Sequence, residues 1–221
     1  MKFRHALAAL FSAALLVSSC GGGDGGGNPM DMDPEPPIRN TPGALLTNWF
    51  ERAYNEQNPS FYTEMLSPDF QFHFTADDAE SLRTILGPEN FWDRTKDLQS
   101  TTAMFGAASV TSVLLDINVS QNSEYLGDDC DGCRQLQTTV VLRVTTTQVT
   151  NETPLVYTVD SPQIFITKPD PDSTGLWLLF RQNDQANPGP IAINEKNGGG
   201  DAREIASNEE RSWGQVKGIF F

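Results

Sequence analysis

Two cysteines three positions apart are the first residues in this chain whose types and spacing could do chemistry. Cys130 and Cys133 stand in a Cys-Asp-Gly-Cys run, and Asp128, Asp129 and Asp131 crowd the thiols. A redox pair usually lies at a helix N-terminus, where the partial positive charge lowers the thiol pKa, whereas three carboxylates raise it. The same carboxylates offer oxygen ligands to Ca²⁺, but their spacing is not that of an EF-hand loop. A structural disulfide is therefore the expected role, with thiol–disulfide oxidoreductase activity as an alternative.

His73 is the second and last histidine of the chain, and it lies in an alternating stretch. Phe70, Phe72 and Phe74 point to one face of the expected strand, so His73 points to the other face or to a pocket rim. A metal site built on several histidines is excluded in the folded part, and no metal or cofactor is expected. No Gly-x-Ser-x-Gly run accompanies His73, so a serine-hydrolase triad is not indicated.

Aromatic side chains form the third group of interest, because their rings can line a ligand pocket while a polar end orients the ligand. The candidate pocket residues are Tyr54, His73, Trp92, Tyr157 and Trp177. In a domain of this size most large aromatic residues belong to the hydrophobic core. An open pocket and a filled core therefore both stay open as interpretations.

The helices that must position these residues are expected before residue 106. Thr41-Pro42 is typical of a helix start, with the hydroxyl as N-cap and proline in the first turn. Apolar residues from Leu45 to Tyr54 recur at three-and-four spacing, which predicts an amphipathic helix. Ser60 is expected to cap a second short helix, and a third helix is expected from Pro88 to about Phe105.

Alternating apolar residues predict strands over the rest of the chain, with the Cys-Asp-Gly-Cys loop as a hairpin tip. The expected strands cover residues 69–74, 113–119, 136–144, 155–167 and 176–182. Pro162 interrupts the fourth of these, and proline requires an edge or a bulge there. Trp213 and Val216, with Ile219 and Phe220, are the one group in the tail that is apolar enough to be buried.

This order of elements resembles the NTF2-like superfamily, which includes SnoaL-like and ketosteroid isomerase-like proteins. The runs LLTNWFERAY at 45–54, YTEMLSPDF at 62–70 and WLLFRQND at 177–184 carry the resemblance. It implies an α+β fold in which three N-terminal helices pack on a curved, mainly antiparallel sheet, as a cone with a pocket at its wide end. It does not imply one function, because this fold hosts enzymes, binders and scaffolds.

In ketosteroid isomerase-like proteins a pocket carboxylate moves a proton while a tyrosine or a protonated acid stabilises an enolate. By resemblance, Tyr54, Asp69, Tyr157 and Asp184 are candidates for these roles, but none matches a catalytic motif. Asp69 is equally typical of a cap at a strand entry, and Asp184 of a loop after the last strand. No catalytic residue is therefore assigned.

The first twenty residues have the pattern of a bacterial export signal. Lys2 and Arg4 precede an apolar run from Ala6 to Val17, and small residues then lead to Cys20. This ending resembles the lipobox of bacterial lipoproteins, which implies that Cys20 is lipidated, palmitate included, and becomes the first mature residue. A plain signal peptide cut near Ser19 is the alternative.

Four parts of the chain follow from these patterns. They are a lipoprotein signal peptide (1–19), a lipidated cysteine with a Gly- and Pro-rich tether (20–40), an NTF2-like domain (41–185) and a C-terminal extension (186–221). A lipid on Cys20 places the protein in the bacterial cell envelope, and Gly21 after it favours the outer membrane by analogy with enteric bacteria. In this oxidising compartment Cys130 and Cys133 are expected to form a disulfide.

The composition is acidic and limits the choice of partners. Without Lys2 and Arg4, 13 basic and 29 acidic residues remain, a net charge of −16. Such a surface repels phosphate backbones, which excludes nucleic acid, and leaves membrane contact to the lipid on Cys20. The expected function is a non-enzymatic module that binds a small apolar ligand or a protein, with homodimerisation through the exposed sheet face as an option. A SnoaL-like isomerase or hydro-lyase is the alternative.

Overall fold

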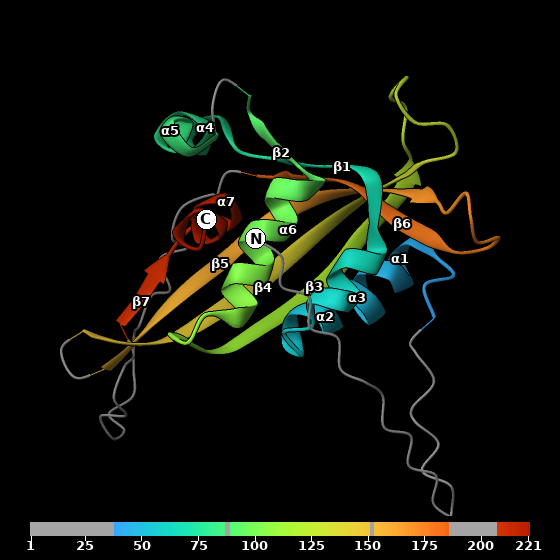
Figure 1. Ribbon diagram of the computed structural model, residues 1–221. Coiled ribbons are helices and arrows are strands. Elements are labelled where there is room, and N and C mark those ends of the chain that lie inside the picture. The colour runs from blue at the N-terminus through green and yellow to red at the C-terminus, as the bar shows by residue number, and fades with distance from the viewer. Residues whose placement is uncertain (1–37, 87–88, 151–152, 186–206) are drawn as a thin grey trace, which may run out of the picture. The chain divides into compact units, whose positions relative to one another are not determined.

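A curved, unclosed sheet with helices on one face organises the folded part of the chain (Figure 1). The computed structural model describes residues 38–86, 89–150, 153–185 and 207–221, which belong to one compact unit. The predicted signal peptide, the lipidation site at Cys20 and the tether as far as residue 37 lie outside the described residues, as does the predicted extension as far as residue 206. None of the helices in the described ranges has the length and apolar character needed to cross a membrane.

The strands follow the order β2-β1-β6-β5-β4-β3, with β7 paired to β5. They are β1 (Leu66–His73), β2 (Phe91–Asp93), β3 (Val110–Glu124), β4 (Arg134–Thr150), β5 (Thr153–Pro169), β6 (Trp177–Asp184) and β7 (Ser207–Glu210). The pairs β1–β6 and β5–β7 are parallel, and the others are antiparallel. This arrangement confirms the predicted α+β class with a mainly antiparallel sheet.

The helical segments are short and lie before, between and after the strands. They are α1 (Pro42–Ala44), the π-helical η1 (Leu45–Phe50), α2 (Glu51–Asn55), α3 (Pro59–Met65), α4 (Ala76–Ser81), α5 (Arg83–Leu86), α6 (Arg94–Gly106) and α7 (Trp213–Ile219). The first helix starts as predicted, because the Thr41 hydroxyl accepts a hydrogen bond from the Ala44 N–H at 3.1 Å. The prediction of Ser60 as the next cap is wrong: the Asn58 side chain accepts from the N–H groups of Ser60 and Phe61, at 3.0 and 3.2 Å.

The helix predicted from Pro88 begins only at Arg94. Residues Phe91–Asp93 pair instead with Gln71–His73 of β1, and Asp93 then caps α6 by accepting from the Lys96 N–H at 2.9 Å. A local pattern of aromatic residues cannot distinguish this strand from a first helical turn, because the pairing partner lies twenty residues away. The short helices α4 and α5 were not predicted.

Pro162 lies inside β5, where it pairs with Thr139 of β4. On its other side, β6 pairs with β5 from Gln163 onward and β7 pairs with Leu155–Thr158. On that side, Pro162 therefore lies in the gap between the segment of β5 that pairs with β7 and the segment that pairs with β6. The predicted requirement for an edge is met without interrupting the strand.

The core fills the space between the helices and the inner face of the sheet. In Figure 1, α6 and α7 lie next to each other in front of β4 and β5. Trp213 and Val216 of α7 are fully buried, as predicted for the tail, but the prediction is wrong for Ile219, which is exposed, and Phe220 is only half-buried. The Trp213 ring lies 5.8 Å from the Phe50 ring and 5.4 Å from the Tyr54 ring. Because of this packing, α7 belongs to the core of the unit.

Candidate functional site

A buried ion pair between Asp97 of α6 and Lys217 of α7 lies among these aromatic side chains. The Lys217 ammonium donates to one oxygen of the Asp97 carboxylate, and the Tyr62 hydroxyl donates to the other at 2.6 Å. The ammonium also donates to the Tyr62 oxygen at 3.1 Å. Asp97 and Tyr62 are 0% exposed and Lys217 is 1% exposed, so water does not reach any of these charges.

Both helices present these groups inward for local reasons. Lys217 follows Trp213 by four residues, so both side chains lie on the same face of α7. The Ser212 hydroxyl caps this helix by accepting from the Gln215 N–H at 3.0 Å. Across the helix pair, the Ser100 hydroxyl donates to the Lys217 carbonyl oxygen at 2.7 Å, which ties α7 to α6.

Burial controls the protonation of the group. It lowers the pKa of the Lys217 ammonium, and the neighbouring Asp97 carboxylate opposes this shift. Burial likewise raises the pKa of the Tyr62 hydroxyl well above its usual range, with the charge of Asp97 adding to the effect. The ammonium lies 4.6 Å from the centre of the Phe72 ring, within the range of a cation–π contact. The arrangement therefore stabilises a cation with a carboxylate, a hydroxyl and an aromatic face.

Two further buried carboxylates accept hydrogen bonds from α7. Asp184 accepts from the Gly214 N–H at 2.8 Å and from the Gln163 amide at 2.6 Å. Asp78 accepts from the Gln215 side-chain amide at 2.8 Å. Asp184 was expected in a loop, but it is the last residue of β6 and only 4% exposed, and burial raises its pKa to about 6.

The raised pKa of Asp184 predicts a pH dependence of stability. The folded chain keeps the proton up to about pH 6, whereas the unfolded chain releases it near pH 3.8, so the folded state binds more protons in between. Below about pH 3.8 the protonated Asp184 carboxyl makes its full contribution to stability. That contribution is lost as the pH rises from about 3.8 to about 6. A shift of this size corresponds to about 3 kcal/mol.

The Asp184→Asn variant should lack this loss. Between about pH 4 and pH 7, its free energy of unfolding should therefore gain about 3 kcal/mol relative to the wild type, measured by urea unfolding at each pH. Asp160→Asn, at an exposed carboxylate of β5, is the matched control and should follow the wild type. A constant difference between Asp184→Asn and wild type across this range would contradict the assignment.

The residues that the sequence offered as a pocket do not form one group. Tyr54 joins the interior cluster, with its ring 5.6 Å from the Tyr62 ring. Trp92 is fully buried against Phe74 and stacks on Phe221. Tyr157 is 8% exposed on β5, opposite Val144, and Trp177 is half-buried at the start of β6. The interior groups Asp97 and Lys217 were not among the candidates.

His73 faces away from the interior cluster, as its alternation with the phenylalanines predicts. Its Nε2 lies 2.9 Å from the Gln71 side-chain oxygen, and its ring stacks on Phe91 at 5.3 Å. Partial burial lowers the His73 pKa, and the nearby Arg181 guanidinium lowers it further. These contacts are those of a half-buried, hydrogen-bonded histidine.

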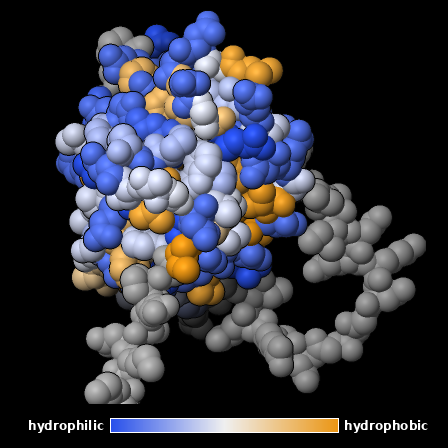
Figure 2. Space-filling model, turned by 90° about the vertical axis from the view of Figure 1, so that its right-hand side faces the viewer, coloured by the Kyte–Doolittle hydropathy of each residue, from blue (hydrophilic) through white to orange (hydrophobic). Residues whose placement is uncertain are grey.

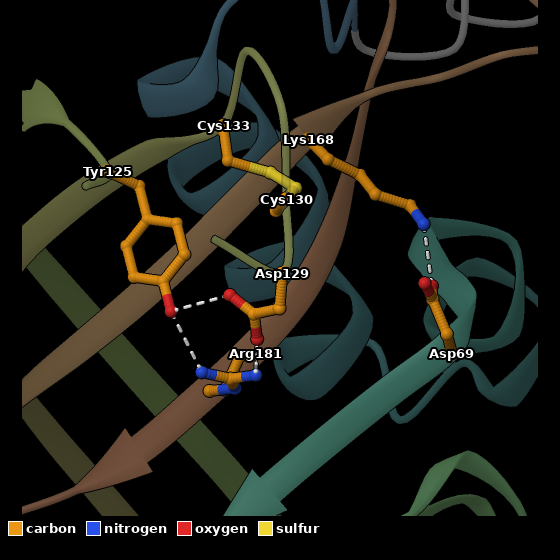
Figure 3. Close-up of a disulfide and its surroundings, with 7 residues drawn as sticks. All are labelled: Asp69, Tyr125, Asp129, Cys130, Cys133, Lys168 and Arg181. Atoms are coloured by element: carbon orange, nitrogen blue, oxygen red, sulfur yellow. Dashed lines mark hydrogen bonds and ion pairs between the residues drawn. A yellow bond between two sulfur atoms is a disulfide. The ribbon is translucent and has the colours of Figure 1, made fainter. Parts of the chain in front are cut away.

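The Cys130–Cys133 pair lies in the loop between β3 and β4, which folds back over β6 (Figure 3). The two Cα atoms are 5.7 Å apart and the sulfurs form a disulfide. Cys133 is 1% exposed and packs with Ile166 and Phe180. No helix begins at the cysteines in this described loop, so the feature that lowers the thiol pKa of redox pairs is missing.

Charged contacts hold this loop on the sheet. The Asp129 carboxylate forms an ion pair with Arg181 of β6 and accepts from the Tyr125 hydroxyl at 3.0 Å (Figure 3). Beside it, Lys168 donates to Asp69 at 2.6 Å, so Asp69 forms an ion pair between strands. The Asp129 oxygens are thus engaged by the protein. In the described part of the chain, no cluster of three or more His, Cys, Asp or Glu side chains is arranged to hold a metal ion.

Replacing both cysteines, as Cys130→Ser/Cys133→Ser, should lower the free energy of unfolding by about 2 kcal/mol, the value expected for closing so short a loop. The Asp129–Arg181 contact should keep the loop near the sheet. Urea unfolding of the oxidised wild type and the variant measures the difference. The reduced wild type is the control and should match the variant; loss of a ligand-binding or catalytic activity without loss of stability would favour the redox alternative.

Hydrophilic side chains cover most of the end of the domain seen in Figure 2, with hydrophobic ones in small separate groups. Leu126 in the β3–β4 loop and Ile38 are exposed singly, at 87% and 58%. Scattered apolar residues of this kind are normal on a protein surface. The described residues therefore present apolar side chains on this face in small groups only.

Comparisons with known proteins gave matches among solved structures. No family model matches the sequence, and no curated protein matches it. A conserved protein from Planctomyces limnophilus is similar in structure, with a TM-score of 0.46, 10% identity, and coverage of 63% of this chain and 88% of that chain. An NTF2-like superfamily protein from Salmonella enterica gives 0.44 and 10%, covering 68% and 91%.

A ketosteroid isomerase-like protein from Erwinia carotovora gives a TM-score of 0.39 and 10% identity, covering 61% of this chain and 85% of that chain. Two of these three structures are named as an NTF2-like superfamily protein and a ketosteroid isomerase-like protein. The similarity concerns the fold alone.

Proposed function

We propose that this chain is a lipid-anchored protein of the bacterial cell envelope and that its folded domain is a non-enzymatic binding module. The anchor is supported by the charged start, the apolar run and the small residues that precede Cys20. The acidic composition supports a domain held by lipid rather than by a basic surface. Binding is supported by the interior of the domain.

The observation that carries the binding proposal is the mutual pairing of the interior charges. Asp97, Lys217 and Tyr62 satisfy one another and are at most 1% exposed. A general acid or base must reach a substrate proton within hydrogen-bond distance, directly or through one water. Paired, sealed groups are unsuited to that task. They hold a ligand only if its charged group takes the place of the Lys217 ammonium, between the same carboxylate and aromatic rings.

One observation favours the isomerase or hydro-lyase alternative. Burial raises the pKa of Asp184 to about 6, close to the range in which a carboxylate serves as a general base near neutral pH. The Asp184 carboxylate nevertheless accepts from Gly214 and Gln163 and is 4% exposed. Its environment is closer to that of a structural acceptor.

Small-molecule binding and turnover separate the two functions. Thermal unfolding should show a rise in Tm with some class among amines, carboxylates and sugars, without consumption of the compound. Conversion of an enolisable ketone, abolished in Asp184→Asn while that variant still unfolds cooperatively, would overturn the binding proposal in favour of the isomerase.

The Cys20→Ser variant tests the anchor. Without a thiol to lipidate, the protein should move from the membrane pellet to the soluble envelope fraction, because no acyl chains remain to hold it. Fractionation followed by immunoblotting measures the distribution, and Ser19→Ala, which keeps the cysteine, is the control. Continued retention of Cys20→Ser in the membrane pellet would rule out the lipid anchor.

A further inference from the structure

The side chain of Lys217 occupies a cage that the rest of the domain provides. Its ammonium meets the Asp97 carboxylate, the Tyr62 hydroxyl and the face of the Phe72 ring, all of them buried. The Tyr62 ring adds a second aromatic surface, 5.6 Å from the ammonium. A carboxylate combined with aromatic faces is the chemistry that recognises an organic cation.

Hydrogen bonds from α7 to neighbouring elements are mostly donated by α7, with the Lys217 carbonyl oxygen, which accepts from Ser100, as the exception. Gly214, Gln215 and Lys217 donate hydrogen bonds to carboxylates, and none of these carboxylates belongs to α7. The acceptors are Asp184, Asp78 and Asp97, in the same order. The surface beneath α7 is therefore anionic and aromatic, and α7 meets it as a donor-bearing, cationic segment.

Contacts with the rest of the domain keep α7 helical, because the sequence of α7 is a poor helix former. The helix has seven residues, which is too short for stability in isolation. Gly214 and Gly218 each cost about 1 kcal/mol relative to alanine in a helix interior. Gly214 is required by close packing, since a Cβ there would lie 2.5 Å from the Phe74 ring. The segment thus resembles a peptide bound in a site, which a competitor for the same contacts can displace.

Within α7, Ile219 is exposed and Gln215 and Gly218 are half-buried. A hollow of about 300 Å³ lies beside it, lined by Ser81, Leu82, Arg211, Gln215, Gly218 and Ile219. Ile219 and Phe221 are 46% and 41% exposed. Outward movement of the helix would uncover Trp213 and Val216 and separate Phe221 from Trp92, so a competing ligand has to offset that loss.

We propose that the Asp97–Tyr62–Phe72 cage is a binding site for a primary amine with an apolar stem, and that α7 occupies it as an internal ligand through Lys217. This rests on the proposed function, for which it names the ligand class. The amine places its ammonium where Lys217 Nζ lies and its stem against the aromatic rings, and α7 leaves the site. The binding step is non-covalent and needs no co-reactant.

Lys217→Ala in the full chain tests the site with n-propylamine, which supplies the atoms that the substitution removes. The amine should raise the Tm of this variant in a saturable manner and bind at least about tenfold more tightly than to wild type, because the internal competitor is gone. 1-Propanol, of the same size without charge, should give no saturable shift. Lys217→Ala/Asp97→Asn should lose the response, because the cage then lacks its carboxylate.

If Lys217→Ala does not fold, hydrogen exchange of the wild-type chain tests the same site. Saturating n-propylamine should speed amide exchange in residues 213–219 while β4 and β5 stay protected, because α7 alone is displaced. No change in that segment would overturn the proposal, as would an equal response of Lys217→Ala to amine and to alcohol. Binding of another compound class with no response to amines would overturn this inference and leave the binding module standing.

Discussion

Asp97→Ala is expected to lower the free energy of unfolding by about 3 to 5 kcal/mol. The substitution leaves the Lys217 ammonium buried without its carboxylate and removes the acceptor of the Tyr62 hydroxyl. An unpaired buried charge cannot recover its lost hydration, so the cost exceeds that of an exposed ion pair, which is about 1 kcal/mol or less. Urea unfolding followed by tryptophan fluorescence measures the change.

The control for this prediction removes both charges together. Asp97→Asn keeps an oxygen for Tyr62, and Lys217→Met keeps the apolar stem while deleting the ammonium. The double variant should lie within about 1 kcal/mol of wild type, because apolar or neutral replacements of a buried pair are often neutral. If Asp97→Ala cost no more than this double variant, the buried ion pair would not hold α7 in place.

Trp213→Ala is the second substitution with a large expected effect, a loss of about 3 to 5 kcal/mol. The indole is fully buried and lies against the rings of Phe50 and Tyr54, so its removal leaves a cavity in the centre of the core. The free energy of unfolding from urea titration reports the loss. It should be accompanied by faster hydrogen exchange throughout α7, because the helix loses its largest buried side chain.

Ile219→Ala is the matched control on the same helix. Ile219 is 46% exposed, so its truncation should change stability by about 0.5 kcal/mol or less. Trp213→Ala and Asp97→Ala should not add in the double variant, because both act through the docking of α7. Equal small effects of Trp213→Ala and Ile219→Ala would show that the C-terminal helix does not belong to the stable core.

These two predictions also bear on the interpretation of the cone. The resemblance implies a pocket at its wide end, and the carboxylates and tyrosines that such a pocket needs are in the interior. In this chain, α7 lies over them, with Trp213 and Lys217 inserted among Tyr54, Tyr62 and Asp97. The question for function is therefore whether α7 leaves, which the amine experiments address.

Local rules account for what the sequence by itself determined. The side chains of a strand alternate between two faces whatever the fold, so Phe70, Phe72 and His73 were correctly assigned to opposite sides. The Thr41 cap followed from the geometry of one helical turn. The burial of Trp213 and Val216 could also be predicted, since two large apolar residues on one face of a short segment need cover.

The burial of Lys217 could be predicted from the local sequence, but its partners could not. Its position four residues after Trp213 was a usable signal, because it places a charge on the buried face of the tail helix. Its partners, however, are 120 and 155 residues away, at Asp97 and Tyr62. Asp97 lies in the first turn of a helix, where an exposed carboxylate is common, and nothing local distinguishes it.

Only the tertiary structure decided which groups meet. The three residues of β2 are a strand because β1 lies beside them, and Asp184 is buried because α7 covers the end of β6. The physical reason is the same in each case. Groups distant in sequence stabilise a paired strand and offset the desolvation cost of a buried charge, so the short-range pattern of the chain does not reveal either.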